Sequence, residues 1–381
     1  MVASGMAVVL LVWYSSFTLC LVLSLGPRQS GNLPSCAGRC DTVGNNPVWP
    51  CQCNNLCVNF GDCCEDYEEV CLSCLDRCGT DYNNLFPCQC NDVCSQKGNC
   101  CQDFDQYCDE SSRLVTDDDL RTLAEALLEM ENNVRGLLTF DLQGQSSPNG
   151  GDEAPEPLFA GELPEEVTSI ESIAKMMALF DNYEPNTTYP EEVTPEEEEE
   201  TSAFLDTIID TPIMQTAYQF LLDKGEIQDD EVAFKERLRE MWFDMYPRDG
   251  PSPGSSGFEH VFMGELQIAA VTGFHGWVWF FLQELEQRVD YFGYLTYRDL
   301  GDKGVHLEHT FKWDGKRKPI SSLYIGASPE LEMALLTVCF ITRPNSICPV
   351  RMAGEDLHIQ TYVEEYNGGI HVGTAYFDIS G

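Results

Sequence analysis

The stretch SSGFEHVF at residues 255–262 is the most informative part of this chain, together with VTGFHGW at residues 271–277. Each stretch places a histidine, His260 or His275, shortly after a Gly-Phe step, in a chain that has only six histidines. Imidazoles titrate near neutral pH, so two of them close together can serve as a base and an acid. The one dense basic cluster, KRK at residues 316–318, follows in a chain of net charge −41. This combination predicts a site for an anion.

These residue types suit one kind of phosphate chemistry. Cleavage of RNA without a metal nucleophile needs a base for the 2′-hydroxyl proton, an acid for the leaving 5′-oxygen and a cation for the phosphate. Two histidines and a lysine supply these three functions. We expect His260 and His275 to flank a phosphate if their segments pair as neighbouring strands, which residues 264–273 between them permit.

The cysteines mark a different part of the chain. Of the 19 cysteines, 16 lie between residues 36 and 108, in two copies of nearly the same spacing. Such density is typical of a disulfide scaffold in an oxidising compartment, which disfavours zinc binding, and spacing alone does not give the connectivity. The first copy contains Cys36, Cys40, Cys51, Cys53, Cys57, Cys63, Cys64 and Cys71, and the second contains Cys74, Cys78, Cys88, Cys90, Cys94, Cys100, Cys101 and Cys108.

Both copies resemble the somatomedin-B domain. Besides the spacing, each has an adjacent cysteine pair followed by an acidic-aromatic step, CCEDY at residues 63–67 and CCQDF at residues 100–104. Somatomedin-B domains are disulfide knots that often bind other proteins, so the resemblance implies a protein partner; a role as a spacer is the alternative. The predicted domains are residues 32–72 and 73–112.

The N-terminus predicts export. The apolar run at residues 7–25 is typical of a secretory signal peptide, here expected to end near residue 26, although it is also long enough for an uncleaved anchor. Cleavage would remove Cys20 and leave a secreted, extracellular protein without stable membrane insertion. In that setting Asn186 is a glycosylation site within Asn-Thr-Thr, and Cys339 and Cys348 are expected to pair.

The rest of the chain predicts an α+β fold. Apolar residues recur at helical spacing in three runs of the acidic middle region, residues 117–128, 204–222 and 232–245. Segments 323–326 and 371–379 are typical of strands, whereas 331–341 fits a buried helix or a buried strand equally well. We therefore expect one domain over residues 113–381, helical in its N-terminal part and built of antiparallel sheets in its C-terminal part.

The two histidine stretches resemble the poly(U)-specific endoribonuclease (EndoU) family. The resemblance includes FKWDGKRK at residues 311–318 and SPE at residues 328–330, and it runs from about residue 114 to the C-terminus. By position it implies that His260 and His275 are the catalytic base and acid, in an order that stays open. It also implies that Lys318 stabilises the charge of the phosphorane.

The same resemblance implies contacts to the substrate. Ser322 matches a residue linked to uracil selection, and Tyr376 matches a tyrosine that stacks on or orients the base or sugar. Lys316 and Arg317 are then accessory substrate contacts.

The resemblance also implies a metal. By resemblance, Glu259 and Glu265 are the candidate carboxylates, acting through a metal or through histidine orientation, and the implied cofactor is manganese, with calcium as the alternative. The sequence contains no closed ligand set of the kind that zinc or an EF-hand requires. We interpret the cluster His306, Glu308 and His309 as fortuitous.

Together these features imply a secreted endoribonuclease that cleaves single-stranded, uridine-containing RNA and leaves 2′,3′-cyclic phosphate ends. A monomer is expected, with no DNA substrate. GPSPG at residues 250–254 formally fits the nucleophile elbow of a serine hydrolase, but the prolines beside Ser252 suit a loop better than a strand-turn-helix. The main alternative is a non-catalytic extracellular module that binds proteins through its somatomedin-B domains.

Overall fold

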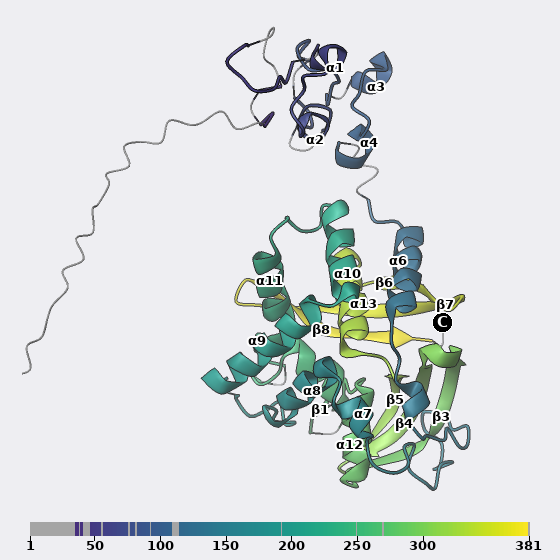
Figure 1. The fold of residues 1–381 in the computed structure, drawn as a ribbon. Coiled ribbons are helices and arrows are strands. Elements are labelled where there is room, and N and C mark those ends of the chain that lie inside the picture. Colours follow the sequence, from purple (N-terminus) through teal and green to yellow (C-terminus); the bar gives the residue numbers. More distant parts are fainter. Residues whose placement is uncertain are drawn as a thin grey trace, which may run out of the picture. The chain divides into compact units, whose positions relative to one another are not determined.

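The structure is a computed structural model that describes residues 35–37, 39–40, 46–54, 56–74, 77–80, 82–91, 93–108, 114–191, 193–248, 250–268 and 270–379. The chain divides into two compact units, Met1–Cys108 and Asp109–Gly381 (Figure 1). We call them the cysteine-rich unit and the C-terminal unit. The predicted signal peptide and Cys20 lie outside the described residues. Within the described ranges, no helix has the length and apolar character needed to span a membrane.

The cysteine-rich unit contains two copies of one disulfide framework. Each copy has two short helices, α1 (Cys57–Phe60) and α2 (Tyr67–Cys71) in the first, α3 (Cys94–Lys97) and α4 (Phe104–Tyr107) in the second. Numbered in order, the eight cysteines of each copy pair first with fourth, second with eighth, third with seventh and fifth with sixth. The bonds are Cys36–Cys53, Cys40–Cys71, Cys51–Cys64, Cys57–Cys63, Cys74–Cys90, Cys78–Cys108, Cys88–Cys101 and Cys94–Cys100.

The acidic residue after each cysteine pair helps to hold its copy together. An Asp66 oxygen accepts a hydrogen bond from the Cys36 backbone N–H at 2.9 Å, and Asp103 accepts one from Cys74 at 2.9 Å. The motif CCEDY and its counterpart CCQDF therefore make the same contact in both copies, from their aspartate to the first cysteine of the copy.

Several helices in the helical part of the C-terminal unit begin with side-chain caps. Thr116 caps the first long helix by accepting from Asp119 N, and the Asp119 side chain accepts from Thr116 N in return. The run expected as one helix at residues 204–222 is two helices, because Thr211 caps the second and Pro212 cannot continue the first. The helices are α6 (Asp117–Met130), α7 (Glu165–Thr168), α8 (Glu171–Ala178), α9 (Pro195–Ile209), α10 (Pro212–Asp223) and α11 (Glu231–Phe243), with short η1 (Arg135–Leu137) and η2 (Leu179–Asp181).

Two three-stranded antiparallel sheets follow. One contains β3 (Val289–Asp299), β4 (Val305–Trp313) and β5 (Lys316–Ile325), with η4 (Gly301–Lys303) between the first two; the other contains β6 (Ile347–Met352), β7 (Glu355–Tyr366) and β8 (Gly369–Asp378). Asp314-Gly315 and Asn367-Gly368 close two of the hairpins with positive φ at both residues, the conformation that matches the twist of the flanking strands. A short hairpin of β1 (Glu265–Leu266) and β2 (Val271–Thr272) precedes them.

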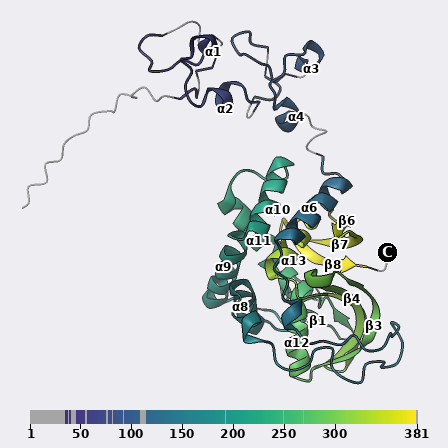
Figure 2. The ribbon, with the colours of Figure 1, turned by 45° about the vertical axis from the view of Figure 1, so that its right-hand side comes forward.

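The two sheets meet along β5 and β8. Helix α12 (Trp277–Leu285) packs against β3 and β5, while α6, α11 and α13 (Pro329–Thr342) pack against strands of the other sheet. Helices α8–α11 gather on one side of the unit and the sheets on the other (Figures 1 and 2). The segment that sequence periodicity left open, residues 331–341, belongs to α13. Every residue from Leu331 to Phe340 is buried, so the helix has no solvent-facing side to mark its period.

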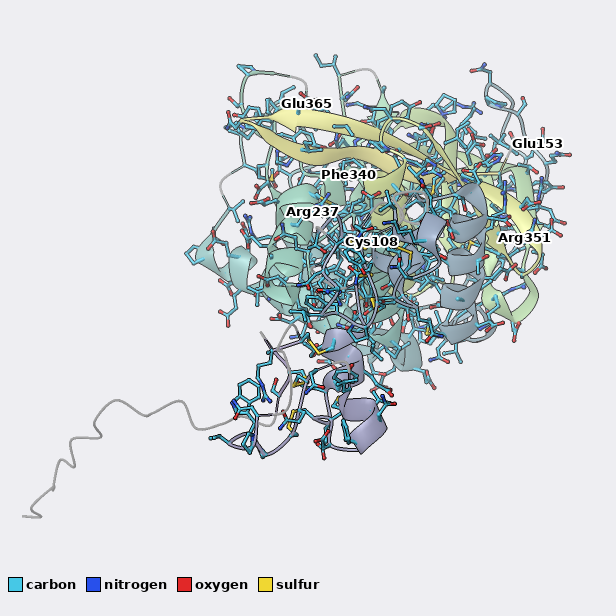
Figure 3. All side chains as sticks on the ribbon, turned by 90° about the horizontal axis from the view of Figure 1, so that it is seen from above. Cys108, Glu153, Arg237, Phe340, Arg351 and Glu365 are labelled. Carbon is cyan, nitrogen blue, oxygen red and sulfur yellow. A yellow bond between two sulfur atoms is a disulfide. The ribbon has the colours of Figure 1, made fainter. Side chains whose placement is uncertain are left out.

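A ninth disulfide joins Cys339 on α13 to Cys348 on β6. Both cysteines are buried. Figure 3 labels Phe340, the residue after Cys339, within the body of the unit, whereas the exposed side chains of Arg351 and Glu365 lie at its surface. The bond therefore links a core helix to the sheet that it covers.

Replacing both cysteines by alanine should lower the free energy of unfolding by about 3 kcal/mol, because the loop closed by the bond becomes free in the unfolded chain. Urea unfolding of the wild-type and double-variant proteins measures this difference. Equal unfolding free energies would contradict the Cys339–Cys348 disulfide. So would a thiol titration of the unfolded, unreduced proteins that finds two more reactive thiols in the wild type than in the variant.

Candidate active site

Backbone hydrogen bonds bring the two histidine stretches together. Phe274 N donates to His260 O at 3.0 Å, His275 N to Val261 O at 2.6 Å and Gly276 N to Phe262 O at 3.1 Å. The expectation of neighbouring strands was wrong for both histidines. His260 lies in a π-helical turn, η3 (Glu259–Met263), and His275 lies between β2 and α12, while the short β1–β2 hairpin between them pairs as strands. The segments nevertheless lie side by side.

A glycine makes this close approach possible. Gly273 has φ of +61°, and a Cβ there would lie 1.7 Å from the His260 carbonyl oxygen. Any other residue would push the two segments apart, so the glycine of the Gly-Phe-His motif is required by packing.

Glu265 holds His260. The His260 Nδ1 and Glu265 Oε2 atoms are 2.8 Å apart, and both side chains are buried. The other carboxylate oxygen pairs with Arg248 Nε at 3.0 Å and accepts from the Ser255 hydroxyl, and the Thr272 hydroxyl donates to Oε2 at 3.1 Å. Four donors therefore surround one carboxylate.

These contacts set the charges of the pair. Burial alone would raise the pKa of Glu265, but His260, Arg248 and Ser255 together lower it to about 2. An ionised carboxylate only accepts hydrogen bonds, so Nδ1 of His260 carries the proton and Nε2 keeps its lone pair in the neutral ring. Burial lowers the pKa of His260, while Glu265 opposes that change.

His275 is held differently. Its Nδ1 lies 3.0 Å from the Ser322 carbonyl oxygen and 3.1 Å from the Ser322 hydroxyl, and because a carbonyl only accepts, Nδ1 carries the proton here too. Its ring stacks on Tyr376 of β8, with centroids 5.0 Å apart and planes 7° apart. Burial and the nearby charge of Lys318 lower the pKa of His275 well below its usual value, which leaves the ring neutral at pH 7.

The basic cluster divides between two faces of β5. Partial burial lowers the pKa of Lys318 to about 8, with Glu265 opposing, and its charge acts on both histidines. Lys316 Nζ donates to the Gln267 carbonyl at 2.6 Å, next to the β1–β2 turn. Arg317 instead donates to the Gly150 carbonyl at 2.8 Å. Strand alternation explains why Arg317 lies apart from Lys318.

Glu259 occupies separate surroundings from Glu265. Its Oε2 accepts from Ser256 N at 2.7 Å, and burial together with the charge of Glu191 raises its pKa to about 8. Glu191 in turn has its pKa raised to about 7, first by burial. The two carboxylates line a cavity of about 50 Å³ with Asn182 and Glu197. Among the described residues, no hydrogen-bond partner faces the buried Oε2 atom of Glu191.

Sequence reasoning missed the residues that hold Glu265, chiefly Arg248. Its guanidinium also donates to the Gly373 carbonyl at 2.8 Å and so links β8 to the His260 side of the site. No spacing pattern in the sequence marks an arginine twelve residues before a histidine.

Two other sequence candidates do not converge on the site. His306 and His309 are buried among aromatic rings, with no hydrogen-bond partner for any of their ring nitrogens among the described atoms. Strand alternation places them on opposite faces of β4. Ser252 lies in a loop between α11 and η3. In the described part of the chain, the close-set groups of potential metal ligands are cysteines that already form disulfides.

Comparison with known proteins identifies this arrangement. The model of the family described as Endoribonuclease XendoU matches residues 119–377, and that of the Somatomedin B domain matches residues 34–73 and 72–111. The chain belongs to the XendoU endoribonuclease family, with two somatomedin-B domains ahead of the family domain.

Individual relatives align with nearly the whole length of this chain. A uridylate-specific endoribonuclease of Mus musculus is 35% identical over 92% of this chain and 95% of its own length, and one of Homo sapiens is 32% identical over 94% and 98%. A solved structure of XendoU, described as a splicing-independent snoRNA-processing endoribonuclease, is 33% identical with a TM-score of 0.57. It covers 68% of this chain and 96% of that chain.

Replacing Glu265 by glutamine should lower the free energy of unfolding by about 3 kcal/mol at pH 7, because Arg248 would lose its buried counter-charge. The folded-state pKa of Glu265 is about 2, below the ordinary value of 4.5, so its contribution is present above pH 4.5 and is lost as pH falls toward 2. Urea unfolding at pH 7 and pH 3 should therefore show a smaller difference at pH 3.

The matched control is Glu365→Gln, an exposed glutamate on β7 that should unfold like the wild type at both pH values. An equal loss of unfolding free energy at pH 7 and pH 3 for the Glu265 variant would show that packing, and not the charge of Glu265, stabilises these contacts.

Proposed function

We propose that this protein cleaves single-stranded RNA after uridylates, by attack of the 2′-hydroxyl on the adjacent phosphate, and leaves a 2′,3′-cyclic phosphate. One observation carries the proposal: two imidazoles on adjoining segments each have Nδ1 hydrogen-bonded and Nε2 without a partner among the described residues, and the charge of the half-buried Lys318 acts on both. This is the arrangement that a base, an acid and a phosphate cation require.

His275 is the proposed base and His260 the proposed acid. His275 faces a neutral carbonyl and the positive Lys318, so it starts without a proton and can take one from the 2′-hydroxyl. His260 faces the ionised Glu265, which stabilises an imidazolium, so this is the ring that takes up a proton from solvent at Nε2 before it acts as the acid. The 2′-oxygen bonds to phosphorus, the 5′-oxygen leaves, and His260 Nε2 supplies the proton that this oxygen takes up. Lys318 offsets the added negative charge of the phosphorane.

The preference for uridylates rests on Ser322 and Tyr376. The Ser322 hydroxyl, next to His275, is able to donate to or accept from the edge of a base, and the Tyr376 ring offers a surface for a base or sugar. The printed names of the relatives describe them as uridylate-specific, which supports the same preference here.

A divalent cation, with manganese as the proposed ion and calcium as the alternative, fits Glu259 better than Glu265. Glu265 has no acceptor position left, because four donors already occupy its oxygens. Glu259 and Glu191 repel one another, and Glu191 Oε2 and the Tyr183 hydroxyl are buried without partners among the described atoms. Oxygen ligands of this kind suit manganese and calcium. When bound, such a cation would neutralise the two carboxylates beside η3.

The cysteine-rich unit supports a protein partner and an extracellular location. Its many disulfides are typical of proteins outside the cytosol. On α1, the apolar side chains of Val58 and Phe60 are exposed, as is Leu56 before it, whereas Ser95 and Lys97 stand at the matching positions of the second copy. We propose the first copy as the partner-binding one. The monomeric state and glycosylation at Asn186 stay predictions.

Alanine variants of the three proposed catalytic residues test the function. His260→Ala and His275→Ala should each lower kcat for a uridine-containing oligonucleotide by about 10³-fold, and Lys318→Ala by about 10²-fold, since each removes one role in the transition state. Mass spectrometry of the products should find 2′,3′-cyclic phosphate ends.

His358→Ala, a half-buried histidine on β7, serves as the control and should cleave like the wild type. Undiminished cleavage by the His260 or His275 variant would reject the site. An inactive wild type, with or without manganese, would favour the protein-binding function alone.

The metal site has its own test. Glu191→Gln with Glu259→Gln should weaken Mn²⁺ binding by at least about tenfold, measured by calorimetry, because the cation loses both charged ligands. Glu198→Gln, an exposed acid of α9, is the control and should bind as the wild type does. Equal binding by all variants would place the metal effect on the acidic surface or on the RNA.

A further inference from the structure

Tyr362 is an exposed aromatic residue on the strand beside Tyr376. It is 48% exposed and lies on β7, opposite Thr374 of β8, while Gln360 lies opposite Tyr376. Residues paired across antiparallel strands share a face, so Tyr362 and Tyr376 are diagonal neighbours on one face of the sheet. The two rings are close enough for Tyr362 to add, after burial, to the raised pKa of Tyr376.

This face does not contribute to the core. The buried residues of the same strands, among them Ile359, Ala375 and Phe377, alternate with it and point to the other side. The packing of the unit therefore does not require an aromatic residue at position 362.

Two cross-strand rows at Tyr362 hold no charged side chain. The row that contains Tyr376 continues through Gln360 to Ile347 of β6, and the next row contains Tyr362 and Thr374. Carboxylates flank these rows, because Asp378 lies two residues beyond Tyr376 and Glu364 two residues beyond Tyr362. In a chain of net charge −41, most of the surface repels a polyanion. The two uncharged rows that begin at Tyr376 are the part of this face where a base lies against no carboxylate.

We infer that Tyr362 binds a second nucleobase of the RNA, that of the nucleotide adjoining the cleaved uridylate. This inference rests on the proposed function. With the uridine against Tyr376 and the phosphate between the histidines, the strand continues over a neighbouring surface, and the diagonal ring is within reach of the next base. Stacking on an aromatic ring accepts any base, so the site adds affinity without adding sequence preference.

The test uses three oligonucleotides, each with one uridine among adenosines: one intact, one abasic on the 5′ side of the uridine and one abasic on the 3′ side. Tyr362→Ala should lower kcat/KM for the intact oligonucleotide about tenfold, mainly through KM, because one stacked base is lost. One of the two abasic substrates should show the same loss with the wild type and no further loss with the variant, and that substrate identifies the side. Tyr362→Phe, which keeps the ring, should cleave like the wild type.

Tyr297→Ala is the matched control, a tyrosine 42% exposed on β3 of the other sheet, and it should not alter cleavage. Wild-type kinetics for Tyr362→Ala on the intact RNA, or equal additional losses on both abasic substrates, would overturn the inference while leaving the proposed function intact. An inactive wild type would remove the proposed function, and the inference with it.

Discussion

The candidate site depends on one buried carboxylate. Glu265 is fully buried and ionised, and an ion in that position is stable only because His260, Arg248, Ser255 and Thr272 all donate to it or pair with it. The same contacts orient His260, connect the η3 turn to β2 and, through Arg248, reach the backbone of β8. The geometry of the acid is therefore maintained by the group that also sets its charge.

The charge distribution of the protein matches a site that depends on few charged groups. A strongly acidic chain cannot hold RNA through a broad basic surface, and of the three basic residues in the KRK cluster only Lys318 acts on the histidines. Lys316 and Arg317 instead donate to backbone carbonyls, of Gln267 and Gly150 respectively. Attraction for phosphate is thus concentrated where the reaction is proposed to occur, and weak binding elsewhere limits nonspecific association.

The sequence predicted what was local and missed what was distant. The two histidine stretches, the basic cluster and the cysteine repeats are short patterns, so the family followed from them, and the α+β class followed from the local helical and strand periodicities. The helix at residues 331–341 could not be assigned, because a segment buried on all sides has no apolar face to give a period. The π-helical turn at His260 and the role of Arg248 depend on contacts between segments that no spacing records. The difference between Glu259 and Glu265 likewise appears only when their neighbours are known.

The proposed site residues come from separate parts of the fold. His260 lies on η3, His275 on the segment before α12 and Lys318 on β5, whereas Tyr376 comes from β8, in a sheet that contacts β5 without belonging to the same hydrogen-bonded ladder. Arg248 joins Glu265 to the backbone of β8, and the Tyr376 ring stacks on His275, so β8 is tied to both histidines. A displacement of that sheet would therefore change the proposed nucleoside surface and the proposed acid–base pair together.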